Sequence, residues 1–91
     1  MAITAVFETP GMTQQQYEKT VSDLAANGLG APDGRIHHVA SLSGNGMFIV
    51  DIWESEELLG KFAEALMPII IANGATPAEP SILPVHNIIE G

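Results

Sequence analysis

The sequence predicts a single small α+β domain whose elements follow the order βαββαβ. Three observations carry this prediction: two segments that open with helix-capping residues, an Asn-Gly pair between two β-type runs, and β-type runs near both ends of the chain. At 91 residues the chain has room for one domain, residues 1–91, without an internal repeat or a linker.

The first third of the chain is typical of a strand followed by a helix. Residues 2–9 alternate small, polar and apolar side chains and end at a Pro-Gly pair, as a strand does before a turn. Thr13 and Gln16 have the spacing of a capping box. Met12 and Tyr17 have the spacing of a hydrophobic staple, so a helix begins here and runs to an Asn-Gly pair.

The middle of the chain is typical of a hairpin. The runs 35–43 and 47–54 are rich in β-type residues and flank Asn45 and Gly46. An Asn-Gly pair between two such runs favours a two-residue turn with this pair at its centre.

This turn fixes which side chains of the hairpin meet. With the Asn-Gly pair at its centre, His38 lies opposite Trp53, and Asp51 lies diagonally across on the same face. His37 then lies opposite Glu54 on the other face. A slip in the turn would exchange these partners, so the pairing depends on the turn type.

The last third predicts a second helix and a final strand. Ser55 has the position of an N-cap, and two glutamates after it place negative charge at the positive end of the helix dipole. Pro68 removes one helical hydrogen bond and should kink or shorten this helix. Residues 82–90 form the last strand, and Pro84 marks its early part as an edge or irregular.

The simplest packing of these elements is ferredoxin-like, a four-stranded antiparallel sheet with both helices on one face. In that arrangement the first and third strands are central. The second strand pairs with the third, and the fourth pairs with the first.

The third strand is apolar on both of its faces. Its alternating side chains are Met47, Ile49 and Trp53 on one face, and Phe48, Val50 and Ile52 on the other. Two helices cover only one face of the sheet, and soluble monomers rarely expose a large apolar patch. We therefore expect a homodimer in which a second copy covers the other face.

Composition excludes several classes of partner. The net charge is −8, from 11 acidic and 3 basic residues, so the basic surface that nucleic acids or anionic membranes require is missing. No apolar stretch reaches membrane-spanning length, and the first residues do not resemble a signal peptide. Without cysteines there are no disulfides or thiolate metal sites. A cytoplasmic location is expected by default.

One cluster of side chains suggests chemistry. Asp51 can orient the imidazole of His38, which can then act as a general acid or base on a ligand stacked against Trp53. The alternative is that Asp51 is a buried carboxylate satisfied by His38 and that Trp53 is core. His86 either lines a cavity or caps an edge at the surface.

A metal site fails the geometric test within one subunit. His38, His86 and Asp51 are the residue types of a two-His-one-carboxylate iron site. The fold places the two histidines on the two outer strands, roughly 14 Å apart at about 4.8 Å per strand spacing. The sequence also carries no phosphate loop or dinucleotide motif, so no metal and no cofactor are expected.

Three segments carry a family resemblance over nearly the whole chain: PGMTQQQY at the first helix, DIWESEELLGKF across the third strand and second helix, and PVHNII at the end. The sequence resembles small antibiotic-biosynthesis-monooxygenase-like members of the dimeric α+β barrel superfamily. The resemblance implies a homodimer whose sheets meet as a barrel, with a cleft between sheet and helices in each subunit. It implies activities such as cofactor-independent oxygenation, polyketide cyclisation, lactone isomerisation or haem degradation, or none.

Position by position, the resemblance supports an apolar pocket more than a particular reaction. Trp53 matches an aromatic residue that many monooxygenase-like members carry at the end of the third strand. Those members often have a His nine residues later, where this chain has Phe62. No His lies on the second helix, which counts against the axial ligand of haem-degrading members.

The leading hypothesis is therefore a pocket for a small apolar or aromatic molecule, in a cofactor-independent monooxygenase or a cyclase/isomerase. His38 would be the general acid or base, Asp51 its orienting partner and Trp53 the stacking wall. Four further residues are candidates for ligand binding: Tyr17, Phe62, Met67 and His86. The competing hypothesis is a non-catalytic binding or assembly module in which the same residues only pack.

Overall fold

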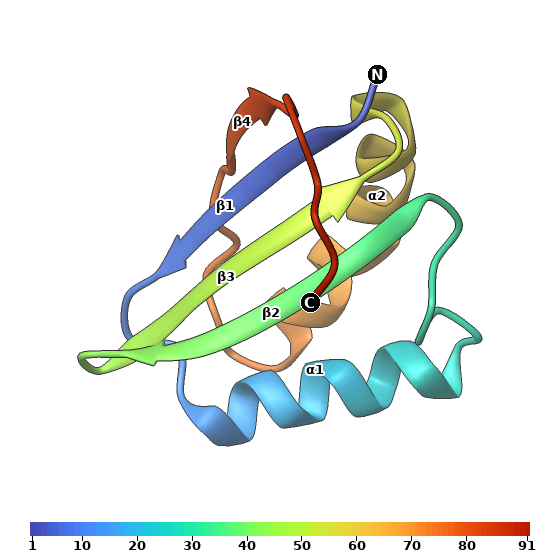
Figure 1. The fold of residues 1–91 in the computed structure, drawn as a ribbon. Helices are drawn as coiled ribbons and strands as arrows, with labels where there is room; N and C mark the ends of the chain where they lie inside the picture. Colours follow the sequence, from blue (N-terminus) through green and yellow to red (C-terminus); the bar gives the residue numbers. More distant parts are fainter.

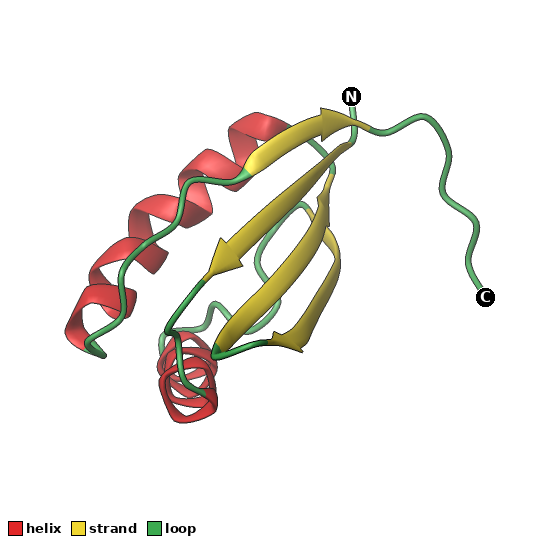
Figure 2. Cartoon of the chain, turned by 90° about the vertical axis from the view of Figure 1, so that its left-hand side faces the viewer, coloured by secondary structure: helices red, strands yellow, loops and turns green.

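The computed structural model describes residues 1–91 and contains six elements in the predicted order (Figure 1). The strands are β1 (Ile3–Thr9), β2 (Arg35–Ser43), β3 (Gly46–Trp53) and β4 (Ser81–Pro84), and the helices are α1 (Gln14–Ala26) and α2 (Glu56–Ala72). The strands form one antiparallel sheet in the order β2-β3-β1-β4. Both helices lie on the same side of this sheet (Figure 2). The predicted ferredoxin-like arrangement is confirmed.

The predicted helix starts are present in the structure. The Thr13 hydroxyl accepts from the backbone N–H of Gln16 at 3.1 Å, and the Gln16 side chain accepts from the backbone N–H of Thr13 at 2.9 Å, which completes the capping box. The Ser55 hydroxyl accepts from the backbone N–H of Leu58 at 3.2 Å, and this bond caps α2.

Pro68 was expected to kink or shorten the second helix, and the shortening does not occur, because α2 continues through Pro68 to Ala72. Leu66 before the proline and Ile69 after it both pack against the hydrophobic core. These contacts hold the turns on either side of Pro68 against the sheet, so the loss of one backbone hydrogen bond does not end the helix.

The hairpin turn lies one residue earlier than predicted. Ser43 pairs with Gly46, so the two central residues are Gly44 and Asn45. A turn centred on Asn-Gly needs positive φ at both residues, whereas here Gly44 takes a φ of 57° and Asn45 stays out of that region. A positive φ at the first central residue alone is the requirement of a type II′ turn, which accounts for the shift.

The earlier turn moves every pairing in the hairpin by two residues along one strand. His38 lies directly opposite Asp51, and the predicted pairing of His38 with Trp53 is wrong. A shift of two keeps each side chain on its predicted face, because strand side chains alternate with a period of two.

An irregularity near the start of β2 changes the remaining pairs. Arg35 pairs with Trp53 and His37 with Ile52, so one extra residue, Ile36, is inserted between them as a β-bulge. The predicted pair of His37 with Glu54 is therefore wrong. The imidazole Nε2 of His37 lies 3.8 Å from a carboxylate oxygen of Glu90 instead.

The last strand is shorter than the predicted 82–90, since β4 ends at Pro84. Its neighbour β1 begins at Ile3, and the pairing ends with one further bond, from the N–H of Val85 to the carbonyl of Ala2 at 3.0 Å. The tail 85–91 therefore leaves the sheet, and Figure 2 shows it extending on the side away from both helices.

The core lies between the sheet and the two helices. It consists of Ile3, Ala5, Leu24, Trp53, Leu59 and Phe62, all buried. No helix or strand covers the other face of the sheet, and only the tail 85–91 crosses in front of it (Figure 1). Val39 and Leu83 on that face are 56% and 58% exposed. No helix has the length and apolar composition that crossing a bilayer requires.

Candidate functional site

A cavity of about 240 Å³ lies between the helix-covered face of the sheet and the two helices. Its walls are mainly apolar and include Phe7, Ile49, Leu59, Phe62, Leu66 and Met67. The loop 76–80, between α2 and β4, contributes to the remaining wall. An apolar cavity with a few converging polar groups is the usual form of a small-molecule site.

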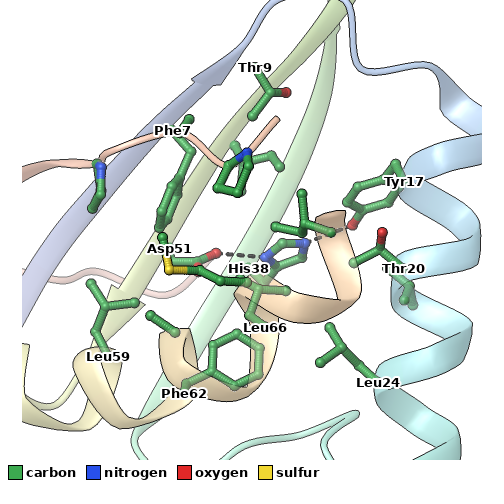
Figure 3. Close-up of a pocket in the computed structure, with 18 of the residues that line it drawn as sticks. Phe7, Thr9, Tyr17, Thr20, Leu24, His38, Asp51, Leu59, Phe62 and Leu66 are labelled. Carbon is green, nitrogen blue, oxygen red and sulfur yellow. Dashed lines mark hydrogen bonds and ion pairs between the residues drawn. The ribbon is translucent and has the colours of Figure 1, made fainter. Parts of the chain in front are cut away.

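Three polar side chains form a continuous hydrogen-bond chain at this cavity (Figure 3). The Tyr17 hydroxyl lies 2.7 Å from Nε2 of His38, and Nδ1 of His38 lies 2.6 Å from one oxygen of Asp51. The other Asp51 oxygen accepts from the indole N–H of Trp53 at 3.2 Å. These hydrogen bonds therefore connect α1, β2 and β3. His38 and Asp51 can bond because they lie directly opposite each other on β2 and β3.

The direction of each bond follows from the chemistry of the groups. Asp51, when ionised, only accepts, so Nδ1 of His38 carries the proton toward it. Burial raises the pKa of Tyr17, an effect that Arg35 opposes and Asp51 strengthens, so the phenol keeps its proton at neutral pH. In the neutral imidazole, Nε2 of His38 then accepts from the Tyr17 hydroxyl.

Trp53 lies beneath the cavity and not in its wall. Its side chain is fully buried, and its ring lies 5.3 Å from that of Phe62 between centroids. The indole has no surface left for a ligand, so it does not provide the stacking wall that the sequence suggested. It holds Asp51 through its N–H and supports Phe62 from below.

The structure places three of the four predicted ligand-binding residues at the cavity. Tyr17, Phe62 and Met67 all line it. His86 is exposed on the tail that follows β4 and lies outside the cavity wall. No three His, Asp or Glu side chains gather where they could share a metal ion.

Sequence reasoning missed Arg35, which also lines the cavity. In a regular strand Arg35 and His38 would point to opposite faces, because they are an odd number of residues apart. The bulge at Ile36 inserts one residue and turns Arg35 to the helix side, where its guanidinium lies 5.9 Å from the Phe62 ring centroid. An Arg two residues before a His-His pair carries no sequence signal for a bulge.

The two helices are joined near the end of α2 by a polar contact. The Asn73 side chain donates to the hydroxyl of Thr20 at 3.2 Å and to a carboxylate oxygen of Asp23 at 3.1 Å. This bond and that from Lys19 lower the pKa of Asp23, so the contact is lost only as the pH falls through that lowered value. Thr20 itself lines the cavity, so this contact fixes part of its wall.

Comparisons with solved structures identify the fold. The cofactor-independent oxygenase SnoaB from Streptomyces nogalater aligns with a TM-score of 0.63 at 11% identity, over 99% of this chain and 96% of that one. An antibiotic biosynthesis monooxygenase-like protein from Chloroflexus aurantiacus aligns with a TM-score of 0.65 at 13% identity, over all of both chains. The haem degrader MhuD from Mycobacterium tuberculosis aligns with a TM-score of 0.53 at 22% identity, over 99% and 100%.

The resemblance suggested by the sequence is thus confirmed at the level of fold: the chain has the fold of antibiotic-biosynthesis-monooxygenase-like proteins. No family model matches the sequence, and no curated protein matches it.

Proposed function

We propose that this protein binds a small aromatic molecule in the cavity and removes a proton from it, as a cofactor-independent monooxygenase. A cyclase or isomerase would use the same first step. The observation that carries the proposal is the hydrogen-bond chain from Tyr17 through His38 to Asp51, which lies in the wall of a mainly apolar cavity. The fold shared with SnoaB, a cofactor-independent oxygenase, supports the same reaction class.

The proton leaves the ligand through Tyr17. A ligand C–H bond breaks and its proton goes to the Tyr17 oxygen, while the proton of Tyr17 moves to Nε2 of His38. The resulting imidazolium is stabilised by the carboxylate of Asp51, which lies 2.6 Å from Nδ1. His38, which also lines the cavity, therefore acts as the base through Tyr17.

Oxygenation then needs only dioxygen as co-reactant. The ligand carbanion gives one electron to O₂, and the radical pair joins to form a C–O bond. The peroxide takes the proton back from the Tyr17 and His38 pair, and the hydroperoxide loses water to leave a ketone. Overall R₂CH₂ and O₂ give R₂C=O and H₂O, with the ligand supplying the electrons.

The test uses anthrone, an aromatic C–H acid, with quinone formation and O₂ uptake measured against a protein-free control. The wild-type protein is expected to accelerate oxidation, and His38→Ala to lower the rate by about 10²- to 10⁴-fold while anthrone still binds. Tyr17→Phe should show a similar loss. Equal rates for the wild type and His38→Ala would overturn the catalytic role.

A non-catalytic binding module is the second candidate. The observation that favours it is that both imidazole nitrogens of His38 are already hydrogen-bonded and Asp51 has a donor at each oxygen. In this case His38→Ala changes no reaction rate but destabilises the fold by about 1–3 kcal/mol, because a buried Asp51 oxygen loses its donor. The rate of anthrone oxidation by the two proteins separates the candidates, because the loss of stability is expected under both.

We also propose that the protein is a homodimer joined through the sheet face opposite the helices. Val39 and Leu83 are more than half exposed there. Val50 pairs with Val39, and Ile52 lies on the same face, separated from Leu83 by Thr4. Soluble monomers rarely leave such an apolar face open, and a second copy is the simplest cover.

Native mass spectrometry tests the dimer. A mass near twice 9.6 kDa is expected for the wild type, and Val39→Asp should give a monomer because it places a charge in the apolar interface. Ile71→Asp is the matched control, because Ile71 is 62% exposed but lies on α2, away from this face. A monomeric wild type would contradict the proposal.

A further inference from the structure

Arg35 places a positive charge, without an ion-pair partner, in the wall of the cavity. The chain has only three Lys and Arg residues against 11 acidic ones, and the two lysines each lie near a carboxylate on their own helix. Arg35 alone makes no ion pair, although it is partly buried in the cavity wall. Its hydrogen bond to Gly30 is exposed, so the guanidinium lies where the cavity meets solvent and is open to an anion that enters from there.

The chain holds the guanidinium in place without using up its donors. One N–H of Arg35 donates to the carbonyl of Gly30 at 3.0 Å, and the group lies over the ring of Phe62. A guanidinium has five N–H donors, so four stay free once this bond is made. Contact with an aromatic face leaves the edge of the guanidinium open to an acceptor.

The acidic side chains at the cavity do not serve as this acceptor. Asp51 already accepts from His38 and Trp53. Glu79 lines the rim but is exposed, and it lies beyond ion-pairing distance of Arg35. The positive charge of Arg35 still acts inside the cavity, where it lowers the pKa of Tyr17 against the effect of burial.

We propose that the ligand of this cavity is an aromatic carboxylate and that Arg35 selects it by binding the carboxylate. The planar fork of a guanidinium matches a carboxylate with two parallel hydrogen bonds, while the ring of the ligand contacts the apolar wall. The bulge at Ile36 turns Arg35 toward the cavity and so allows it to bind the carboxylate. The inference rests on the binding half of the proposed function and not on its chemistry.

The experiment compares 2-naphthoate with its uncharged isostere 2-naphthamide by titration calorimetry. The wild type is expected to bind naphthoate about 10- to 100-fold more tightly than naphthamide. Arg35→Met should remove that preference by weakening naphthoate alone. Arg35→Lys should recover only part of it, because an ammonium lacks the fork.

Lys61→Met is the matched control. It removes the same charge from the protein, but Lys61 lies outside the cavity and faces Glu57 on the surface of α2. It is expected to leave the preference unchanged. If Lys61→Met weakens naphthoate as much as Arg35→Met does, net charge accounts for the effect and the inference is overturned.

Three other results would also overturn it: equal binding of both probes by the wild type, binding of neither, or an equal loss of both in Arg35→Met. The wild-type comparison decides the matter even if an Arg35 variant does not fold. A naphthoate preference without anthrone oxidation would leave this inference standing while the catalytic proposal fails.

Discussion

Replacing Asp51 with Asn is expected to reverse the hydrogen-bond chain while leaving the fold in place. The amide oxygen can still accept from the indole N–H of Trp53, but the amide NH₂ must now face Nδ1 of His38. His38 then carries its proton on Nε2 and donates to the Tyr17 oxygen. Tyr17 can no longer pass its proton to His38, so proton removal from a ligand stops.

The expected loss of anthrone oxidation is about 10²- to 10⁴-fold, the usual contribution of a positioned base. In Ser-His-Asp triads the same exchange acts through the wrong imidazole tautomer and costs about 10⁴-fold in kcat. The ¹⁵N chemical shifts of His38 report the tautomer directly. Retention of the Nδ1–H form in Asp51→Asn, or wild-type turnover, would contradict the proposed direction of the chain.

Asp51→Ala serves as the contrasting variant. It leaves both the His38 and the Trp53 N–H without an acceptor, at about 1–3 kcal/mol for each buried group that finds no water. Asp51→Asn should therefore unfold close to the wild type in urea, and Asp51→Ala clearly earlier. The comparison separates two effects: Asp51→Ala removes a hydrogen-bond partner, whereas Asp51→Asn keeps a partner but moves the proton of His38.

The sequence predicted the centre of the site in spite of a wrong turn. Side-chain direction in a strand depends only on whether the register shift is odd or even, and the actual shift was two residues. His38 and Asp51 therefore stay on one face, as predicted, and the structure shows that this is the helix side and makes them direct partners. Tyr17 reached the same place because the capping box fixed the start of its helix.

The features that the sequence did not reveal depend on tertiary structure. Arg35 points into the cavity because of a β-bulge, and the sequence RIHHV does not predict that bulge. The last strand stops at Pro84, which pairs with Ile3 at the start of β1, so its end is set by the partner strand and not by the β-type residues of PVHNII. Trp53 was predicted to stack against a ligand but is fully buried. An alternation pattern shows which face of the sheet a side chain lies on, but it does not show how deeply the side chain is buried.

Truncation of Trp53 is expected to be the most destabilising change in the chain. Trp53 is the only large side chain that is completely buried, and it packs against Phe62. Trp53→Ala should cost about 3–5 kcal/mol, because it leaves a cavity beneath the site and removes the donor to Asp51. Urea unfolding followed by circular dichroism is the measurement, since the variant has no tryptophan to report by fluorescence.

Trp53→Phe separates the two parts of that cost. It keeps most of the aromatic packing and removes the N–H, so one buried oxygen of Asp51 loses its donor, at about 1–3 kcal/mol. A small domain has little stability to lose, so Trp53→Ala can fail to fold while Trp53→Phe still reports. If Trp53→Phe is as stable as the wild type, the indole bond does not hold Asp51 and the carboxylate is fixed by His38 alone. The hydrogen-bond chain then ends at Asp51, and the contribution of Trp53 is packing beneath Phe62.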